Sequence, residues 1–194
     1  LEAMQEKQIT IASETFKLDR PFIVLATQNP IEQDGTYPLP EAQQDRFLMK
    51  VKIEYPTKSE EKDMLKLLTS VSDFDSIQIN EILNKDRIEK IKQIIREIHI
   101  DEKLMDYILD IVFKTRETNN YIACGASPRA SIALVVSAKA NAFLEGRDHV
   151  IPQDIKRVIF DVLRHRMILT YEAEAEGKKV EDIITDILEI VELP

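Results

Sequence analysis

The sequence has few of the residues from which disulfides, metal sites and membrane spans are built. Its 194 residues include one cysteine, Cys124, which can form no disulfide within the chain and which we expect to be small and buried. The three histidines, His99, His149 and His165, are scattered and lack metal-ligand spacing. Apolar runs such as 22–26 are far shorter than the roughly 20 residues of a membrane-spanning helix. No metal site or membrane insertion is expected, and a reducing cytoplasm is the expected setting.

Basic residues are too few to favour a nucleic-acid partner. The chain has 26 Lys and Arg against 35 Asp and Glu, which gives a net charge of −9. This excess acid repels a phosphate backbone unless a basic face is segregated elsewhere. With 44% hydrophobic and 31% charged residues, the composition is that of a globular protein that folds in water.

Local patterns divide the chain near Pro56 into an α/β part, residues 1–56, and an all-α part, residues 57–194. In the first part, alternating apolar residues predict a β-hairpin over 8–18, and an uninterrupted apolar run predicts a buried strand over 22–27. A second strand is expected over 48–53, adjacent and parallel to the first. A proline in the first turn suits a short helix over 40–47.

Helix signals dominate from Thr57 onward. Thr57 and Glu60 form a capping box, and Asp101 is a cap-like residue ahead of a second apolar face. Further helices are expected from Pro128 to Gly146, from Pro152, and after Gly177. The helix from Pro128 carries a dense apolar run over 130–136, which predicts burial among its neighbours.

Polar residues follow the predicted strand 22–27 where it ends. In open α/β sheets, ligands bind beyond the carboxyl ends of the strands, so Gln28 or Asn29 could orient a water or a phosphate there. The alternative is an ordinary Asn-Pro turn at Asn29 and Pro30.

Two arginines lie at helix ends. Arg46 ends the short helix, where it could neutralise phosphate charge in a neighbouring subunit or could simply complement its own helix dipole. Arg129 follows the N-cap Ser127 and Pro128, and a cation in a first turn opposes the dipole by about 0.3–1 kcal/mol. That cost is explained if both the arginine and the free N–H groups face an anion. A lone arginine at a helix start is also common without any such role.

A basic triplet, Arg164-His165-Arg166, follows the helix that begins at Pro152. These side chains could touch a phosphate or a partner. The alternative, which the pattern favours, is that they complement the negative end of the helix dipole.

Taken together, five strings resemble the MoxR-type AAA+ ATPases over essentially the whole chain, in order and at compatible spacing. They are Leu1-Glu2-Ala3-Met4-Gln5-Glu6, Ala26-Thr27-Gln28-Asn29-Pro30, Gly35-Thr36-Tyr37-Pro38-Leu39-Pro40-Glu41-Ala42-Gln43 with Asp45-Arg46-Phe47, Gly125-Ala126-Ser127-Pro128-Arg129-Ala130 and Tyr171-Glu172-Ala173-Glu174-Ala175.

The resemblance implies a partial AAA+ P-loop core with its pre-sensor hairpin, followed by a helical lid domain. It implies a ring, expected to be a hexamer of identical subunits, that uses ATP and Mg to remodel or mature a client protein. By position, Asn29 matches the sensor 1 residue that aligns the attacking water, and Arg46 matches the arginine finger presented to the neighbouring subunit. Arg129 matches the sensor 2 arginine of the lid, which contacts the γ-phosphate.

The sequence departs from the family pattern in one respect. It has no G-x-x-x-x-G-K-[ST] phosphate loop and no apolar strand ending in Asp-Glu that would hold magnesium. In the family both lie upstream, so the resemblance implies a C-terminal portion whose ATP and Mg are bound mainly by preceding residues. Residues 1–194 alone are expected to be inactive as an ATPase.

Two other functions stay open. The helical part could be an adaptor that binds a protein without using nucleotide. A DNA-directed AAA+ relative, such as a helicase or clamp loader, is disfavoured because acidic residues outnumber basic ones from Thr57 onward.

Overall fold

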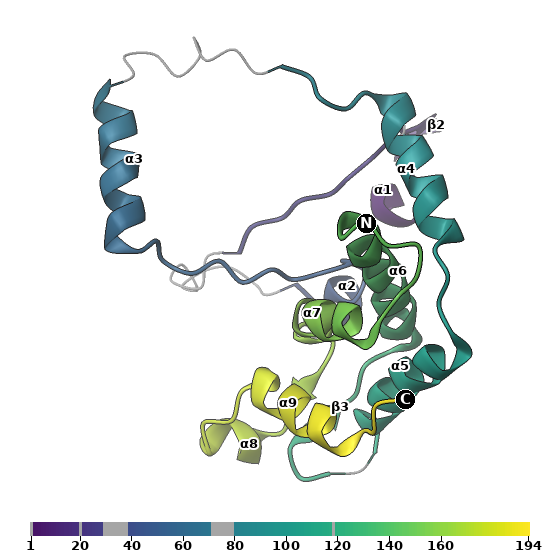
Figure 1. The fold of residues 1–194 in the computed structure, drawn as a ribbon, viewed down its shortest axis with the longest axis vertical. Coiled ribbons are helices and arrows are strands. Elements are labelled where there is room, and N and C mark those ends of the chain that lie inside the picture. Colours follow the sequence, from purple (N-terminus) through teal and green to yellow (C-terminus); the bar gives the residue numbers. More distant parts are fainter. Residues whose placement is uncertain (1, 20, 29–38, 71–79, 118) are drawn as a thin grey trace.

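The computed structural model describes residues 2–19, 21–28, 39–70, 80–117 and 119–194 (Figure 1). Within these ranges the helices are α1 (Glu2–Glu6), α2 (Glu41–Gln44), α3 (Lys58–Ser70), α4 (Lys85–Glu97), α5 (Glu102–Lys114), α6 (Pro128–Leu144), α7 (Pro152–Leu163), α8 (Tyr171–Ala175) and α9 (Val180–Ile190). The strands are β1 (Gln8–Ile11), β2 (Glu14–Lys17), β3 (Ile122–Cys124) and β4 (Ile168–Leu169). No helix in the described ranges has both the length and the apolar character that crossing a bilayer requires.

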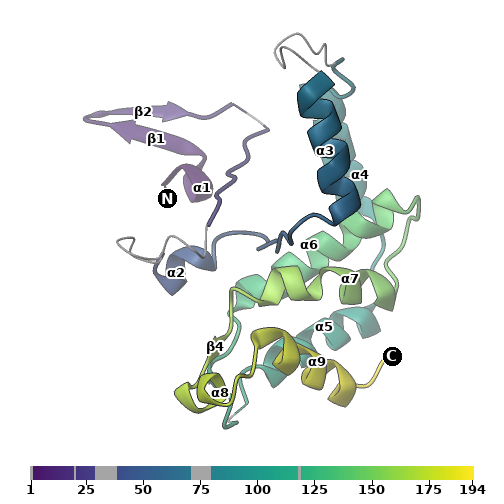
Figure 2. The ribbon, with the colours of Figure 1, turned by 90° about the vertical axis from the view of Figure 1, so that its left-hand side faces the viewer.

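The apolar core lies entirely in the C-terminal helical part. Every buried apolar residue of the described chain falls between Ile98 and Ile187. Helix α6 is central and packs against α4, α5 and α7, while α9 covers α5 and α7 (Figure 2). Buried alanines along α6 let these neighbours approach closely; they are Ala130, Ala133, Ala138 and Ala142.

The predicted helix starts are confirmed by their caps. The Thr57 N–H and hydroxyl both donate to Glu60 Oε2 at 2.7 Å. Asp101 and Ser127 accept hydrogen bonds from the first turns of α5 and α6. These caps satisfy backbone N–H groups that a helix cannot satisfy itself, so each end is determined by a few neighbouring residues.

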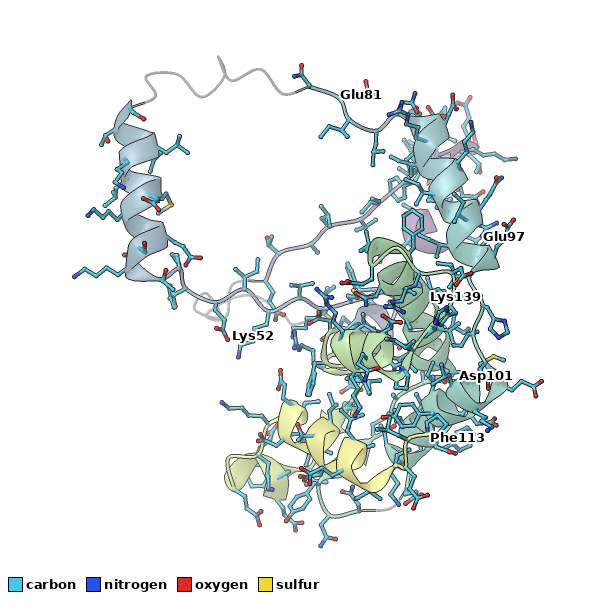
Figure 3. All side chains as sticks on the ribbon, in the orientation of Figure 1. Lys52, Glu81, Glu97, Asp101, Phe113 and Lys139 are labelled. Atoms are coloured by element: carbon cyan, nitrogen blue, oxygen red, sulfur yellow. The ribbon has the colours of Figure 1, made fainter. Side chains whose placement is uncertain are left out.

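Side-chain contacts also join α4 to α6. Lys139 Nζ donates to the carbonyl of Arg96 at 3.0 Å, and Figure 3 shows Lys139 beside Glu97 at the end of α4. Helix α3, in contrast, has no buried residue and stands apart from α4 (Figure 1).

The hairpin of the first part is confirmed, whereas the predicted pair of parallel strands is wrong. Strands β1 and β2 pair antiparallel, with Gln8 opposite Lys17. Residues 22–28 and 48–53 form no strand and belong to no sheet. Ile23 and Leu25 are 75% and 92% exposed. A buried strand needs ladder partners on its edges, and none of the described residues supplies them to either segment.

The short sheet in the helical part was not predicted. Strands β3 and β4 pair antiparallel, with Ile122 opposite Leu169, and Thr170 N–H donates to the Tyr121 carbonyl at 3.0 Å. Strands of two or three residues are too short to show periodicity. Cys124 in β3 is exposed, contrary to expectation.

A buried carboxylate fastens the start of α7. Ile151 has no capping hydroxyl, and its N–H instead donates to Asp154 Oδ2 at 2.8 Å. Asp154 also accepts from Asn141 Nδ2 at 2.7 Å and from the guanidinium of Arg147. Burial alone would raise the pKa of Asp154, but these hydrogen bonds outweigh burial and keep it below its ordinary value.

Replacing Asp154 is therefore expected to be costly. Asp154→Ala leaves the Ile151 N–H and the Asn141 amide without their acceptor and should lower the free energy of unfolding by about 2–3 kcal/mol. Asp182 is the matched control, because it accepts from Lys179 N–H with the same spacing at the start of α9 but is exposed. Asp182→Ala should cost about 1 kcal/mol. Urea denaturation measures both values, and equal losses would contradict this account of Asp154.

Candidate functional site

The structure brings two of the predicted site residues to one place. Arg46 follows α2, and Arg129 lies in the first turn of α6. Both line one cavity with a volume of about 200 Å³. The third, Asn29, lies outside the described residues, and the neighbouring Gln28 is exposed.

The carboxylate of Asp45 joins α2 to the helical part. It accepts hydrogen bonds from Ser127 Oγ at 2.8 and 3.0 Å, from Arg129 Nη1 at 3.1 Å and from Arg166 Nε at 3.1 Å. Burial alone would raise the pKa of Asp45, but the hydrogen bonds from Ser127, Arg129 and Arg166 and the charge of Arg166 lower it overall. Asp45 is therefore an anion that gathers groups from α6 and from the end of α7.

The loop before α6 is fixed against the end of α5. The Ala126 N–H donates to Thr115 Oγ1 at 2.9 Å, and the Ala126 carbonyl accepts from Arg116 Nε at 2.8 Å. A Cβ at Gly125 would lie 2.3 Å from the Thr115 carbonyl oxygen, so only glycine fits there. This close approach places Ser127 and Arg129 opposite Asp45.

The basic triplet 164–166 binds the backbone after α2. Arg164 Nη1 donates to the Lys50 carbonyl at 2.9 Å, and His165 Nε2 donates to the Phe47 carbonyl at 3.1 Å. Arg166 donates to the carbonyls of Asp45, Phe47 and Leu48. The Lys50 N–H in turn donates to the Asp161 carbonyl at 2.8 Å.

The role favoured from sequence agrees with one contact, because Arg166 Nη1 donates to the Val162 carbonyl in the last turn of α7. The contacts to the backbone after α2 were not predicted. A signal for Arg166 was nevertheless present in the sequence. The buried face of α7 continues through Val162, and a step of four residues places Arg166 on that face. A charge at such a position needs polar partners within the core.

Guanidinium groups dominate the charge of the cavity. Its lining comprises Asp45, Arg46, Leu48, Arg129, Ile132, Ala133, Val136 and Arg166. Three arginines thus face a single carboxylate, and Arg46 Nε is buried without a hydrogen-bond partner in the described chain. Such an arrangement attracts an anion. The volume is below the roughly 300 Å³ of small-molecule pockets, so it suits the phosphate end of a larger ligand.

The apolar side of the cavity comes from α6. Ile132 and Val136 are exposed on this helix, although the sequence predicted their burial. Their exposure follows from their position at the cavity wall rather than on the faces of α6 that meet other helices. They give the charged groups a low-dielectric side, which strengthens electrostatic attraction.

The described residues of this site do not form a set of metal ligands. Among the described residues, no group of three or more His, Cys, Asp or Glu side chains is placed to hold a metal ion. The cavity can therefore supply positive charge through its arginines, but not the cluster of carboxylates that magnesium prefers.

Comparisons with family models place the two sides of the cavity in different regions. Residues 1–49 match the model described as "ATPase family associated with various cellular activities (AAA)", and residues 115–187 match the "AAA lid domain". Asp45 and Arg46 belong to the first region, and Arg129 and Arg166 belong to the second. Neither model covers 57–114, so the boundary at Pro56 stays a prediction.

Relatives extend the similarity over the whole chain. "Chaperone MoxR1" of Mycobacterium tuberculosis is 41% identical over 202 residues, which cover 100% of this chain and 52% of that protein. "Uncharacterized protein YeaC" of Bacillus subtilis is 41% identical over 194 residues, covering 100% and 60%. A crystal structure from Cytophaga hutchinsonii, provisionally described as an ATPase, has a TM-score of 0.91 and 46% identity and covers 100% and 60%. The chain thus spans between half and two thirds of these proteins.

The hydrogen bond between His165 and the Phe47 carbonyl can be tested through the pH dependence of stability. Burial, together with the charge of Arg166, lowers the pKa of His165 to about 4. Because a carbonyl can only accept, Nε2 carries the proton, and Nδ1 is a buried atom without a partner in the described chain. A second proton on Nδ1 would find no acceptor there.

The free energy of unfolding should therefore fall as the pH drops from about 6.5 towards 4, because the unfolded histidine takes up a proton and the folded one does not. Above about pH 6.5 this group contributes no pH dependence. His165→Gln keeps a donor for the Phe47 carbonyl and should flatten that part of the curve. Urea denaturation between pH 4.5 and 7 measures it, and parallel curves for the two proteins would contradict the assignment.

Proposed function

Because the chain belongs to the MoxR-type AAA+ ATPases, as its motifs predict, we propose that it is the C-terminal part of an ATPase that remodels or matures partner proteins. Its fold class, a portion of the α/β core followed by a helical lid, agrees with both family models and with the structural neighbour. The relative named "Chaperone MoxR1" supports a chaperone-like role. Ring assembly, with a hexamer of identical subunits in the cytoplasm, is part of the proposal.

The observation that carries the proposal is the positively charged cavity. Arg129 has an exposed guanidinium, with its side chain 52% exposed, and makes one contact to Asp45. We propose that Arg129 contacts the γ-phosphate of ATP in its own subunit, and that Arg46 neutralises charge on the ATP of the neighbouring subunit. Phosphoryl transfer develops charge on the phosphate oxygens, and fixed guanidinium groups stabilise it. Asn29 is proposed to orient the attacking water.

The residues of the cavity fit a phosphate group and not a magnesium ion. Three guanidinium groups against one carboxylate favour an anion, and the orphaned Arg46 Nε has a donor available for one. Magnesium is proposed to be held mainly by residues that precede this chain, where ATP would also find its phosphate loop. On this proposal, residues 1–194 alone bind phosphate weakly and do not turn over ATP.

A second candidate function is a helical module that binds proteins without using nucleotide. It is supported by α3, on which no residue is buried and Met64, Leu67 and Leu68 are each about half exposed. Exposed apolar stripes of this kind mark contact surfaces for other proteins. Nucleotide binding by the complete protein that is weakened by Arg129→Ala would favour the ATPase, whereas client binding without any nucleotide effect would favour the module.

The two arginines should give different kinetic defects in the complete protein. Arg129→Ala removes a charge-assisted hydrogen bond to the bound nucleotide and should raise its Kd about 10- to 100-fold. Arg46→Ala should leave the Kd nearly unchanged and lower kcat by about a thousandfold, because its contact matters most in the transition state. Arg157 on α7 is the control, since it is exposed and paired with Glu145 away from the cavity.

Mixing subunits tests whether Arg46 acts on a neighbour. Arg46→Ala subunits are combined with subunits whose own ATP site has been disabled upstream. Some interfaces in mixed rings then pair a working pocket with a working arginine, so activity should reappear with a dependence on the mixing ratio. If demonstrated subunit exchange restores nothing, Arg46 does not act between subunits and its role reverts to complementing the end of α2.

A further inference from the structure

The buried guanidinium of Arg166 has no donor left for a ligand. An arginine offers five N–H groups. In the structure Nε donates to Asp45 Oδ1, Nη1 to the carbonyls of Leu48 and Val162, and Nη2 to the carbonyls of Asp45 and Phe47. Five acceptors therefore match five donors, and the side chain is 2% exposed. Arg166 lines the cavity, but all five of its N–H groups already donate to protein atoms.

Its acceptors surround Arg46 on both sides along the chain. Two lie on Asp45, the residue before it, and two are the carbonyls of Phe47 and Leu48, which follow it. Helix α2 has only four residues, and so short a helix is not stable by itself. The backbone around Arg46 thus depends on contacts from outside α2. Arg166 alone donates four hydrogen bonds to residues 45, 47 and 48.

Arg46 and Arg129 contrast with this saturated arginine. Arg46 Nε has no partner among the described residues, and Arg129 donates from Nη1 to Asp45 alone with its side chain largely in solvent. The three arginines of the cavity therefore divide into two that retain donors for an anion and one that does not.

We infer that Arg166 is a positioning residue for Arg46: from the lid, it fixes the turn 45–48 so that the place of Arg46 follows the position of the end of α7. This inference rests on the proposed function, because it assigns Arg46 to the nucleotide. Arg166 touches no substrate in this scheme, and its effect passes through the backbone that carries Arg46. Motion of the lid relative to α2 would move Arg46 with it.

A lysine at position 166 would test whether the positive charge alone is enough or whether the planar guanidinium is needed. Arg166→Lys keeps a cation beside Asp45, but an ammonium has three donors and no planar fork that reaches carbonyls on both sides of Arg46. The variant should therefore fold while leaving the turn 45–48 less constrained. Arg157→Lys on α7 is the matched control, because Arg157 is exposed and pairs with Glu145.

The test uses the complete protein and measures ATP turnover and backbone hydrogen exchange. Arg166→Lys should lower kcat about 10- to 100-fold, since a misplacement of 1 Å costs about that much, with the KM for ATP changed less than twofold. Amide exchange in a peptide spanning 45–50 should be faster than in the parent protein. Arg157→Lys should change neither measurement.

A double variant shows whether the effect passes through Arg46. If Arg166 acts by positioning Arg46, then Arg46→Ala combined with Arg166→Lys has the same kcat as Arg46→Ala alone. A further loss of tenfold or more in the double variant would overturn the inference, as would a fall in kcat that is matched by a rise in KM. If Arg166→Lys fails to fold, Arg166→Gln keeps two N–H donors at the same position and should also lower kcat without raising KM.

If the proposed function is wrong, the measurements give a different result. If the complete protein hydrolyses no ATP, or if Arg46→Ala keeps the parent kcat, the assignment of Arg46 to the nucleotide is wrong. In that case, amide hydrogen exchange in the peptide 45–50 decides whether Arg166 positions the turn 45–48. Unchanged exchange in 45–50 with Arg166→Lys would overturn the inference, and faster exchange confined to that peptide would support it.

Discussion

The buried ion pair between Asp45 and Arg166 is the contact on which the arrangement of the site depends. It joins a residue at the end of α2 to a residue just after α7, 121 positions later in the chain. Breaking such a pair costs about 3–5 kcal/mol because one charge is left buried alone, whereas replacing both partners with apolar residues can be neutral. The pair therefore contributes less to the free energy of folding than to the relative position of the two segments that it joins. The pair sets where the turn that carries Arg46 meets the helical part.

The same carboxylate also determines how the cavity is charged. Asp45 is satisfied by Ser127, Arg129 and Arg166, so it neutralises at most part of the positive charge that surrounds it. Arg46 Nε has no hydrogen-bond partner among the described residues. The protein thus gathers positive charge in one place, beside Ile132 and Val136, before any ligand arrives. Fixed charges need little reorganisation when a phosphate binds, which is the condition under which electrostatic stabilisation is most effective.

The sequence predicted features that depend on neighbouring residues and missed those that depend on distant ones. The caps at Thr57, Asp101 and Ser127 could be predicted because each involves residues two or three positions apart. The parallel strands were predicted from apolar runs, but a run says nothing about whether a pairing partner exists. Arg46 and Arg129 were singled out by their positions at helix ends and by the family motifs that contain them, but only the fold shows that they share a cavity. Asn29 lies outside the described residues, so its role stays a prediction.

Arg166 shows most clearly why part of the site could not be found by motif. Four of its five acceptors are backbone carbonyls, which every residue type provides, so the residues it holds need carry no recognisable side chain. Only the donor is constrained in type, because no other side chain offers five N–H groups in a planar fork. The contact therefore restricts position 166 closely while leaving Phe47 and Leu48 free to vary, as far as their packing allows. Residues that act on the backbone in this way are found from helical periodicity, as a charge on a buried face, rather than from a shared motif.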